Sequence, residues 1–140
     1  MKDIITYSEV ETKKVARDIA KNMGTTGIIV LNGELGAGKT KFTEGFLSYF
    51  GLENEISSPT FTIANEYKND KVNIYHFDVY RLSDIDEFYA IGGEEYFSKG
   101  ISIIEWGEII EEALPKHYIK IDIQKDEKDF NKRIICIEEK

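Results

Sequence analysis

Residues 33–40 of the chain are GELGAGKT, which matches the phosphate-binding pattern G-x-x-x-x-G-K-[ST]. Glycines in this pattern let successive backbone N–H groups approach a phosphate without collisions from Cβ atoms. The lysine, Lys39, would reach the β- and γ-phosphates, and the hydroxyl of Thr40 would ligate Mg²⁺. The motif therefore predicts binding of a nucleoside triphosphate with Mg²⁺. The residues predicted to contact it are Gly33, Glu34, Leu35, Gly36, Ala37, Gly38, Lys39, Thr40 and Lys41.

Two acidic residues stand at the ends of predicted strands. Asp78 ends the run IYHFD, and Glu105 follows the apolar run ISII. Open α/β folds bind ligands at the carboxyl edge of the sheet, and nucleotide hydrolysis needs carboxylates there. We therefore predict catalytic roles for Lys39, Asp78 and Glu105, with Thr40 and Glu105 as metal ligands. The sequence leaves open which of the two carboxylates acts as base and which holds the metal.

Two further side chains lie close to these acids in the sequence. His76 lies two residues before Asp78, so both should face the same side of a strand. For His76 we favour a hydrogen-bonded position in the core or a supporting position beside the site over a role as catalytic base. Trp106, next to Glu105, is predicted either to wall the nucleotide pocket or to pack in the core.

The chain contains three arginines, which are Arg17, Arg81 and Arg133. Arg81 is the one nearest to Asp78, and an ion pair with acidic neighbours is at least as reasonable a role for it as catalysis. Because an arginine commonly stabilises the charge of a transferring phosphate, we expect slow turnover unless a partner completes the site.

The first half of the chain contains sequence patterns of the helices and the strand that would position these residues. Ser8 and Glu11 form a capping box before a helix that should end at Gly24. Residues 28–31 are a continuous apolar block, typical of a strand buried on both faces, and residues 40–50 have the pattern of a helix. The phosphate motif thus lies between a buried strand and a helix, which is the context that supports it.

The second half of the chain alternates between strand and helix patterns. Runs at 60–67 and 72–79 predict a β-hairpin, and Ser83 is expected to cap a short acidic helix that ends near Gly92. Helical turns are expected at 109–114, and strands at 101–104, 118–123 and 133–137. We therefore expect residues 1–140 to form a single P-loop ATPase domain. Its fold class should be α/β, a P-loop NTPase-like three-layer fold with a mixed, partly parallel central sheet.

Composition excludes several classes of protein. The net charge of −8 argues against an intrinsic grip on nucleic acid, which requires clustered cations. The excess of acids lies in residues 84–112, which either dock a basic partner or form a solvated face. No apolar run is long enough to cross a bilayer, and the lone Cys136 has no partner for an internal disulfide. We expect a cytoplasmic protein that makes no contact with a membrane.

Four motifs together resemble one known family. They are LNGELGAGKT at 31–40, SPTFTIANEY at 58–67, YHFDVYRL at 75–82 and IEWGE at 104–108. In this order and spacing the chain is similar to the small bacterial ATPases of tRNA threonylcarbamoyladenosine biosynthesis, called TsaE and formerly YjeE. The resemblance runs through nearly the whole chain. Gly107 departs from the family pattern, since many members have proline there.

The resemblance implies an activity and its partners. Lys39 and Thr40 would serve ATP and Mg²⁺, Glu105 would help to hold the metal, and Asp78 would be needed for hydrolysis. Glu9, Thr12 and Arg133 would lie near the nucleotide. The family acts with TsaD and TsaB on an adenosine beside the anticodon, so tRNA would be held only through the complex.

Two other functions remain as alternatives to this Mg²⁺-dependent ATPase. A nucleotide-gated adaptor would bind ATP or ADP and contact partners with negligible hydrolysis. A small-molecule kinase would need an acceptor pocket and usually an arginine-rich lid, and the sequence has no such lid. A GTPase is disfavoured because the string N-K-x-D is absent.

Overall fold

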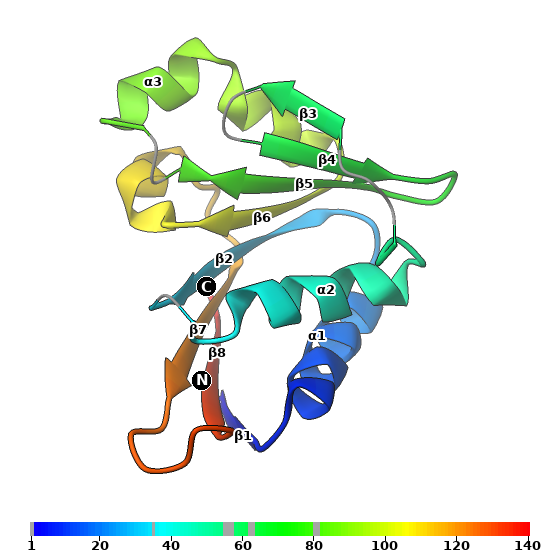
Figure 1. Cartoon of the computed structure of the whole chain (residues 1–140). Helices are drawn as coiled ribbons and strands as arrows, with labels where there is room; N and C mark the ends of the chain where they lie inside the picture. Colours follow the sequence, from blue (N-terminus) through cyan, green and yellow to red (C-terminus); the bar gives the residue numbers. More distant parts are fainter. Residues whose placement is uncertain (1, 35, 55–57, 62–63, 80–81) are drawn as a thin grey trace.

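The computed structural model describes the chain except residues 1, 35, 55–57, 62–63 and 80–81, and for residues 58–61 it describes the backbone alone. The described part forms an eight-stranded sheet with helices on both faces (Figure 1). The strands are β1 (Lys2–Thr6), β2 (Gly27–Gly33), β3 (Ser58–Phe61), β4 (Ala64–Lys68), β5 (Asn73–Asp78), β6 (Ile101–Glu105), β7 (Ile119–Lys125) and β8 (Arg133–Glu139). The α-helices are α1 (Glu9–Met23), α2 (Lys39–Tyr49) and α3 (Ile85–Ala90), and the 3₁₀ helices are η2 (Gly93–Ser98) and η3 (Gly107–Ala113).

The centre of the sheet is parallel and its outer parts are antiparallel. Among the described strands the order is β1-β8-β7-β2-β6-β5-β4-β3. Strand β2 pairs in parallel with β6 and β7, and β5 pairs in parallel with β6. Glu105 lies opposite both Leu31 and Asp78. The carboxyl ends of β2, β5 and β6 therefore meet at one edge of the sheet.

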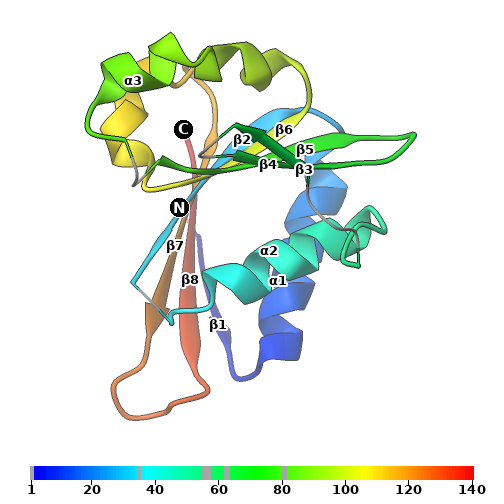
Figure 2. The ribbon, with the colours of Figure 1, turned by 45° about the horizontal axis from the view of Figure 1, so that its top comes forward.

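Successive side chains of the central strands point to opposite faces of the sheet, and each face carries a hydrophobic core. Ile29 and Leu31 of β2 belong to the core that α1 and α2 cover. Ile28 and Val30 belong to the opposite core, which includes Phe88 of α3. The sheet therefore lies between two helical layers, as Figure 2 shows. These observations confirm the predicted three-layer α/β fold with a mixed, partly parallel sheet.

Several predicted elements are confirmed and one strand is corrected. Helix α1 follows Ser8, whose side chain accepts a hydrogen bond from the N–H of Glu11, and it ends at Gly24. Strands β4 and β5 form the predicted hairpin. The prediction of one strand over 60–67 is wrong, because β3 and β4 are separate strands that pair with each other.

The structure differs from the sequence-based expectations in three further short segments: the start of α3, η2 and β1. Asp84, and not Ser83, caps α3, since its carboxylate accepts a hydrogen bond from the N–H of Glu87. The chain after α3 forms the 3₁₀ helix η2, which the sequence pattern did not predict. Strand β1 was also missed, and it exists through its antiparallel pairing with β8.

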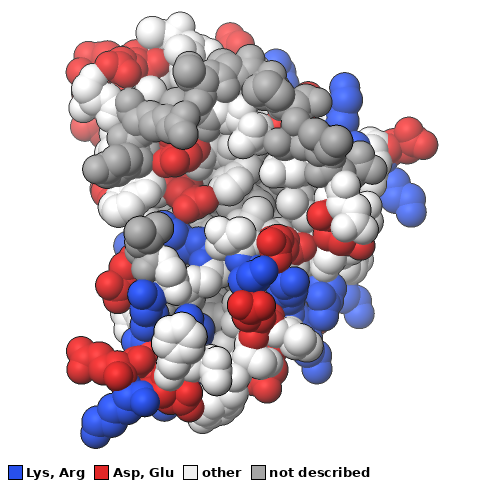
Figure 3. All heavy atoms as spheres, in the orientation of Figure 1, with Lys and Arg blue, Asp and Glu red and all other residues white. Residues whose placement is uncertain are grey.

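Charges are unevenly distributed over the surface. Acidic side chains gather over α3, whereas lysines gather over α1 and α2 (Figure 3). The acidic residues 84–112 include exposed side chains in α3, η2 and η3, all on the same helical layer. None of the described helices has the length and apolar character needed to span a bilayer.

Candidate nucleotide-binding site

The phosphate motif forms the turn from β2 into α2. Gly36 and Gly38 have φ values of 80° and 113°, a conformation that side chains with a Cβ rarely adopt. Gly38 is the N-cap of α2, and no side chain caps the helix there. The first N–H groups of α2 and the positive end of its dipole are therefore available to an anion.

The charged residues of the sheet edge lie on the face that α2 covers. In β5, Ile74 packs into the α1–α2 core, so the alternating residues His76 and Asp78 face the same side. In β6 the same argument from Ile103 places Glu105 on that side. The structure therefore brings the carboxyl end of β6 opposite the first residue of α2.

Glu105 lies between Lys39 and His76. Its Oε1 lies 3.3 Å from Nζ of Lys39, and its Oε2 lies 2.6 Å from Nε2 of His76. Burial raises the pKa of Glu105, but the hydrogen bond from His76 and the charges of His76 and Lys39 outweigh burial and bring this pKa below its ordinary value. Glu105 is therefore ionised near neutral pH. His76 therefore supports Glu105, which is one of the two positions that the sequence left open for it.

A cavity of about 480 Å³ opens at this point of the structure. Its lining residues come from α1, the phosphate loop, the sheet edge and the β7–β8 connection. They are Ser8, Glu9, Thr12, Gly36, Gly38, Lys39, Thr40, Lys41, Asp78, Glu105, Trp106, Phe130, Asn131 and Arg133. The cavity thus gathers the three predicted catalytic residues and most of the predicted nucleotide contacts.

Some of the predicted nucleotide contacts do not line this cavity or already have a hydrogen-bond partner. Gly33 and Glu34 line a second cavity, and Leu35 lies outside the described residues. Ala37 is buried with 1% exposure. Thr12 lines the cavity, but its buried hydroxyl shares a 2.8 Å hydrogen bond with Thr6.

Two of the predicted side chains already have protein partners. The ammonium of Lys41 lies 3.4 Å from Glu44 and 3.9 Å from Glu9. Arg133 donates from Nε to the carbonyl of Ala37 at 2.8 Å and from Nη2 to the carbonyl of Gly36 at 3.4 Å. Arg133 therefore braces the phosphate loop from the side of β8.

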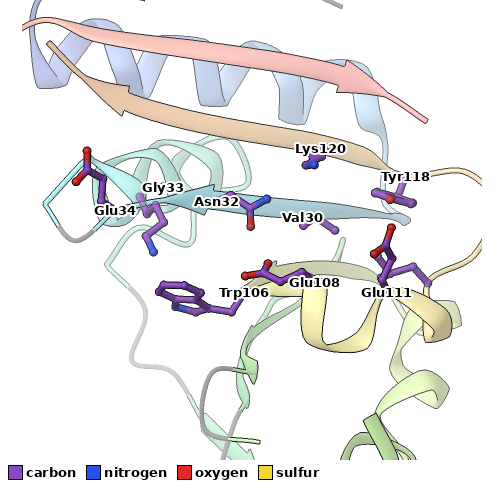
Figure 4. Close-up of a pocket in the computed structure, with 12 residues that line it drawn as sticks. Val30, Asn32, Gly33, Glu34, Trp106, Glu108, Glu111, Tyr118 and Lys120 are labelled. Carbon is purple, nitrogen blue, oxygen red and sulfur yellow. The ribbon is translucent and has the colours of Figure 1, made fainter. Parts of the chain in front are cut away.

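The second cavity lies on the other face of the sheet and has a volume of about 490 Å³. Figure 4 shows Trp106, Glu108 and Glu111 on one side of it, across from Asn32 of β2 and Lys120 of β7. Lys39 and Trp106 line both cavities, and Lys39 Nζ lies 5.1 Å from the centre of the Trp106 ring. Trp106 therefore lines both cavities, and its predicted role in walling a nucleotide pocket stays a prediction.

The backbone of Trp106 has a φ of 64°, in the left-handed region. A bulky residue held there stores strain that the surrounding packing must balance. Gly107 follows, and a Cβ at this glycine would lie 2.7 Å from Cγ1 of Val30. The backbone after Glu105 therefore passes close to Val30 of β2. The Cβ of a proline at position 107 would meet the same contact.

The donor set fits Mg²⁺. Among the described residues no group of three or more His, Cys, Asp or Glu side chains lies close enough to hold a metal by itself. Mg²⁺ in nucleotide sites is commonly held by one or two protein oxygens together with phosphates and water. Glu105 and Thr40, both lining the first cavity, are oxygen donors of this kind.

The fold and this edge of the sheet define a P-loop NTPase-like α/β protein. The family model described as "Threonylcarbamoyl adenosine biosynthesis protein TsaE" matches residues 6–135. The chain belongs to the TsaE family.

Individual relatives agree with this assignment. The chain is 42% identical over 131 residues to "tRNA threonylcarbamoyladenosine biosynthesis protein TsaE" of Rickettsia conorii, a match that covers 93% of this chain and 74% of the relative. It is 40% identical over 121 residues to the protein of the same name from Bacillus subtilis, covering 86% and 75%. The crystal structure of Bacillus subtilis YdiB superposes with a TM-score of 0.72 at 36% identity, covering 96% of this chain and 82% of that one.

Three lining residues were not predicted from the sequence. Ser8, Phe130 and Asn131 line the first cavity. Ser8 was identified only as a helix cap, and no motif covers the β7–β8 connection. The one signal available was an isolated phenylalanine in the polar run DEKDFNK at 126–132.

Proposed function

We propose that this chain is the Mg²⁺-dependent ATP-binding and ATP-hydrolysing subunit of the tRNA threonylcarbamoyladenosine system. It would act in the cytoplasm with TsaD and TsaB, and tRNA would be held by these partners. One observation carries the ATPase proposal: Lys39, Thr40, Asp78 and Glu105 line one cavity at the uncapped start of α2. The names of the family and of its members support the pathway.

Each residue has a distinct role in this proposal. The N–H groups of the phosphate loop and the ammonium of Lys39 bind the β- and γ-phosphates. Thr40 and Glu105 would hold Mg²⁺, which supplies neutralisation of the phosphate charge when bound. Asp78, opposite Glu105 on the neighbouring strand, orients the attacking water. When the nucleotide binds, Lys39 would weaken its ion pair with Glu105 and contact the γ-phosphate instead.

The surface charge supports dependence on partners for tRNA. A net charge of −8 disfavours direct contact with phosphate backbones, so cationic partners would have to hold the tRNA. Of the described arginines, Arg133 donates to carbonyls of the phosphate loop. Nη1 of Arg17 donates to Oγ of Ser48 at 3.4 Å, near the end of α2 away from the phosphate loop. We therefore propose that turnover is slow without partners.

Phosphate release provides the test. Release of inorganic phosphate from ATP would be measured with the purified chain, with and without TsaD and TsaB, and with Mg²⁺ present or chelated. The tRNA modification would be reconstituted in parallel, with ATP present throughout. Phosphate release that requires Mg²⁺ and rises with partners supports the proposal. No release in any mixture, with ADP still bound, would favour the nucleotide-gated adaptor.

A second candidate function, phosphoryl transfer to a small molecule, is favoured by one observation. The second cavity reaches Lys39 and has the size of a small-ligand pocket. Mass spectrometry would distinguish the two, because a kinase transfers the γ-phosphate to an acceptor whereas an ATPase releases it to water. We rank this candidate lower because the sequence has no arginine-rich lid segment.

A further inference from the structure

Phe130 is a large aromatic side chain that lies almost entirely exposed to solvent. It is 87% exposed, the highest value among the exposed large apolar side chains of the described chain. It lies in the connection between β7 and β8, which projects beyond the sheet in Figure 1. An isolated exposed phenylalanine is unremarkable on most surfaces. This one, however, lines the cavity that also contains the phosphate loop.

The backbone of Phe130 is tied to that loop through one guanidinium. Arg133 donates from Nη1 to the carbonyl of Phe130 at 2.6 Å and from Nε to the carbonyl of Ala37 at 2.8 Å. The connection also has an internal brace, because the carboxylate of Asp126 accepts hydrogen bonds from the N–H groups of Lys128 and Asp129. The backbone of Phe130 is therefore tied to the phosphate loop through Arg133.

Another part of the lining comes from the start of α1, where the hydroxyl groups of Ser8 and Thr12 already form hydrogen bonds. The hydroxyl oxygen of Ser8 accepts from the N–H of Glu11, and the hydroxyl of Thr12 is bonded to that of Thr6. Phe130 and the residues that would hold phosphates line the same cavity, and its volume of about 480 Å³ is in the range of pockets for nucleotide-sized ligands. Phe130 is thus the aromatic side chain that the β7–β8 connection contributes to this lining.

We propose that Phe130 is the base-stacking residue of this site, with the purine of the nucleotide lying against its ring while the phosphates occupy the loop. This inference rests on the proposed nucleotide function and deepens it. Stacking on an aromatic face is tolerant of the base, because every base has a π-face. Phe130 therefore supplies affinity for the purine and does not by itself select adenine over guanine.

The test compares ligands with and without a base. Dissociation constants for ADP, GDP and inorganic tripolyphosphate would be measured by calorimetry, with Mg²⁺ present, for the unmodified chain, Phe130→Ala and Phe130→Tyr. The Tyr89→Ala variant, on exposed surface of α3, serves as the control. We expect Phe130→Ala to weaken ADP and GDP by the same factor of about 5 or more, the effect of one lost stack. Phe130→Tyr and Tyr89→Ala should bind ADP as the unmodified chain does.

The tripolyphosphate measurement separates the possible failures. Unchanged binding of tripolyphosphate to Phe130→Ala would show that the loss is specific to the base, as expected. Equal weakening of tripolyphosphate and ADP would overturn the inference, because Phe130 would then only support the loop. An unchanged affinity of Phe130→Ala for ADP would overturn it as well, while the proposed function stands. If the unmodified chain bound none of the three ligands, the proposed function itself would fail, and the inference with it.

Discussion

Lys39, the first residue of α2, lies 3.3 Å from Glu105, the last residue of β6. The phosphate loop and the sheet edge are thereby joined by one ion pair whose side chains are 13% and 19% exposed. Because a polyphosphate would also attract Lys39, nucleotide binding and the state of Glu105 are coupled through this contact. Five predictions follow from the site and the packing around it.

Replacing Lys39 should weaken nucleotide binding. Lys39→Ala removes a charge-assisted contact with phosphate, and such contacts contribute about 1.5–3 kcal/mol. We expect the dissociation constant for ADP to rise by about 10-fold or more in calorimetry. Lys13→Ala, which loses a surface ion pair with Glu44, should bind ADP normally. Equal affinities of the Lys39→Ala variant and the unmodified chain would contradict the proposed phosphate site.

Replacing Glu105 should separate binding from turnover. Glu105→Ala removes the proposed metal ligand and leaves the phosphate loop in place. We expect ADP binding to remain measurable and Mg²⁺-dependent phosphate release to fall by about 100-fold or more. Normal turnover in this variant would remove Glu105 from the metal site.

His76 should act by positioning Glu105. The partners of a metal-ligating carboxylate commonly contribute about 10- to 100-fold to metal affinity or activity. We expect His76→Phe to raise the Mg²⁺ concentration needed for half-maximal turnover by a factor in this range, with little change in ADP affinity. His76→Gln, which keeps an N–H donor, should restore part of the loss. Identical Mg²⁺ requirements in the two variants would contradict a positioning role.

Gly45 should be needed for the close approach of α1 and α2. A Cβ at this position would lie 2.5 Å from Cα of Lys13 and 2.6 Å from its carbonyl oxygen. Although alanine favours helices, Gly45→Ala should lower the free energy of unfolding by about 1–3 kcal/mol because the helices must separate. Urea denaturation would measure the change, and Tyr49→Ala, at an exposed position of α2, is the control. An unchanged or higher midpoint for Gly45→Ala would refute the close-approach argument.

Tyr75 should make the chain less stable at high pH. Burial, then the hydrogen bond and charge of Glu66 and the influence of Tyr96, raise the pKa of Tyr75 from 10.0 to about 12. The unfolded chain releases this proton first, so the contribution of Tyr75 is fully present below pH 10.0 and is lost as the pH rises toward about 12. The free energy of unfolding should decrease over this window, and less steeply in Tyr75→Phe. Parallel curves for the two proteins would show that Tyr75 does not ionise as described.

Local sequence patterns were reliable where a few neighbouring residues decide the structure. The strand, glycine turn and helix around residues 28–50 follow from side-chain periodicity and from the conformations that glycine allows. The Ser8 cap of α1 likewise depends on residues only three apart. In contrast, β1 has no strong pattern of its own and is stabilised by β8, at the other end of the chain. No short window of sequence contains that pairing.

The sequence alone determined the phosphate motif, the acids at the ends of β5 and β6 and the family, since each depends on the types and order of residues. Tertiary structure decided which of these residues meet. Parallel pairing places Glu105 beside Asp78, and alternation along β5 and β6 turns His76 and Glu105 toward α2. The contact of Arg133 with Ala37 joins residues 96 positions apart. Such contacts depend on the packing of the whole sheet, because strand order and register bring together residues that no local pattern relates.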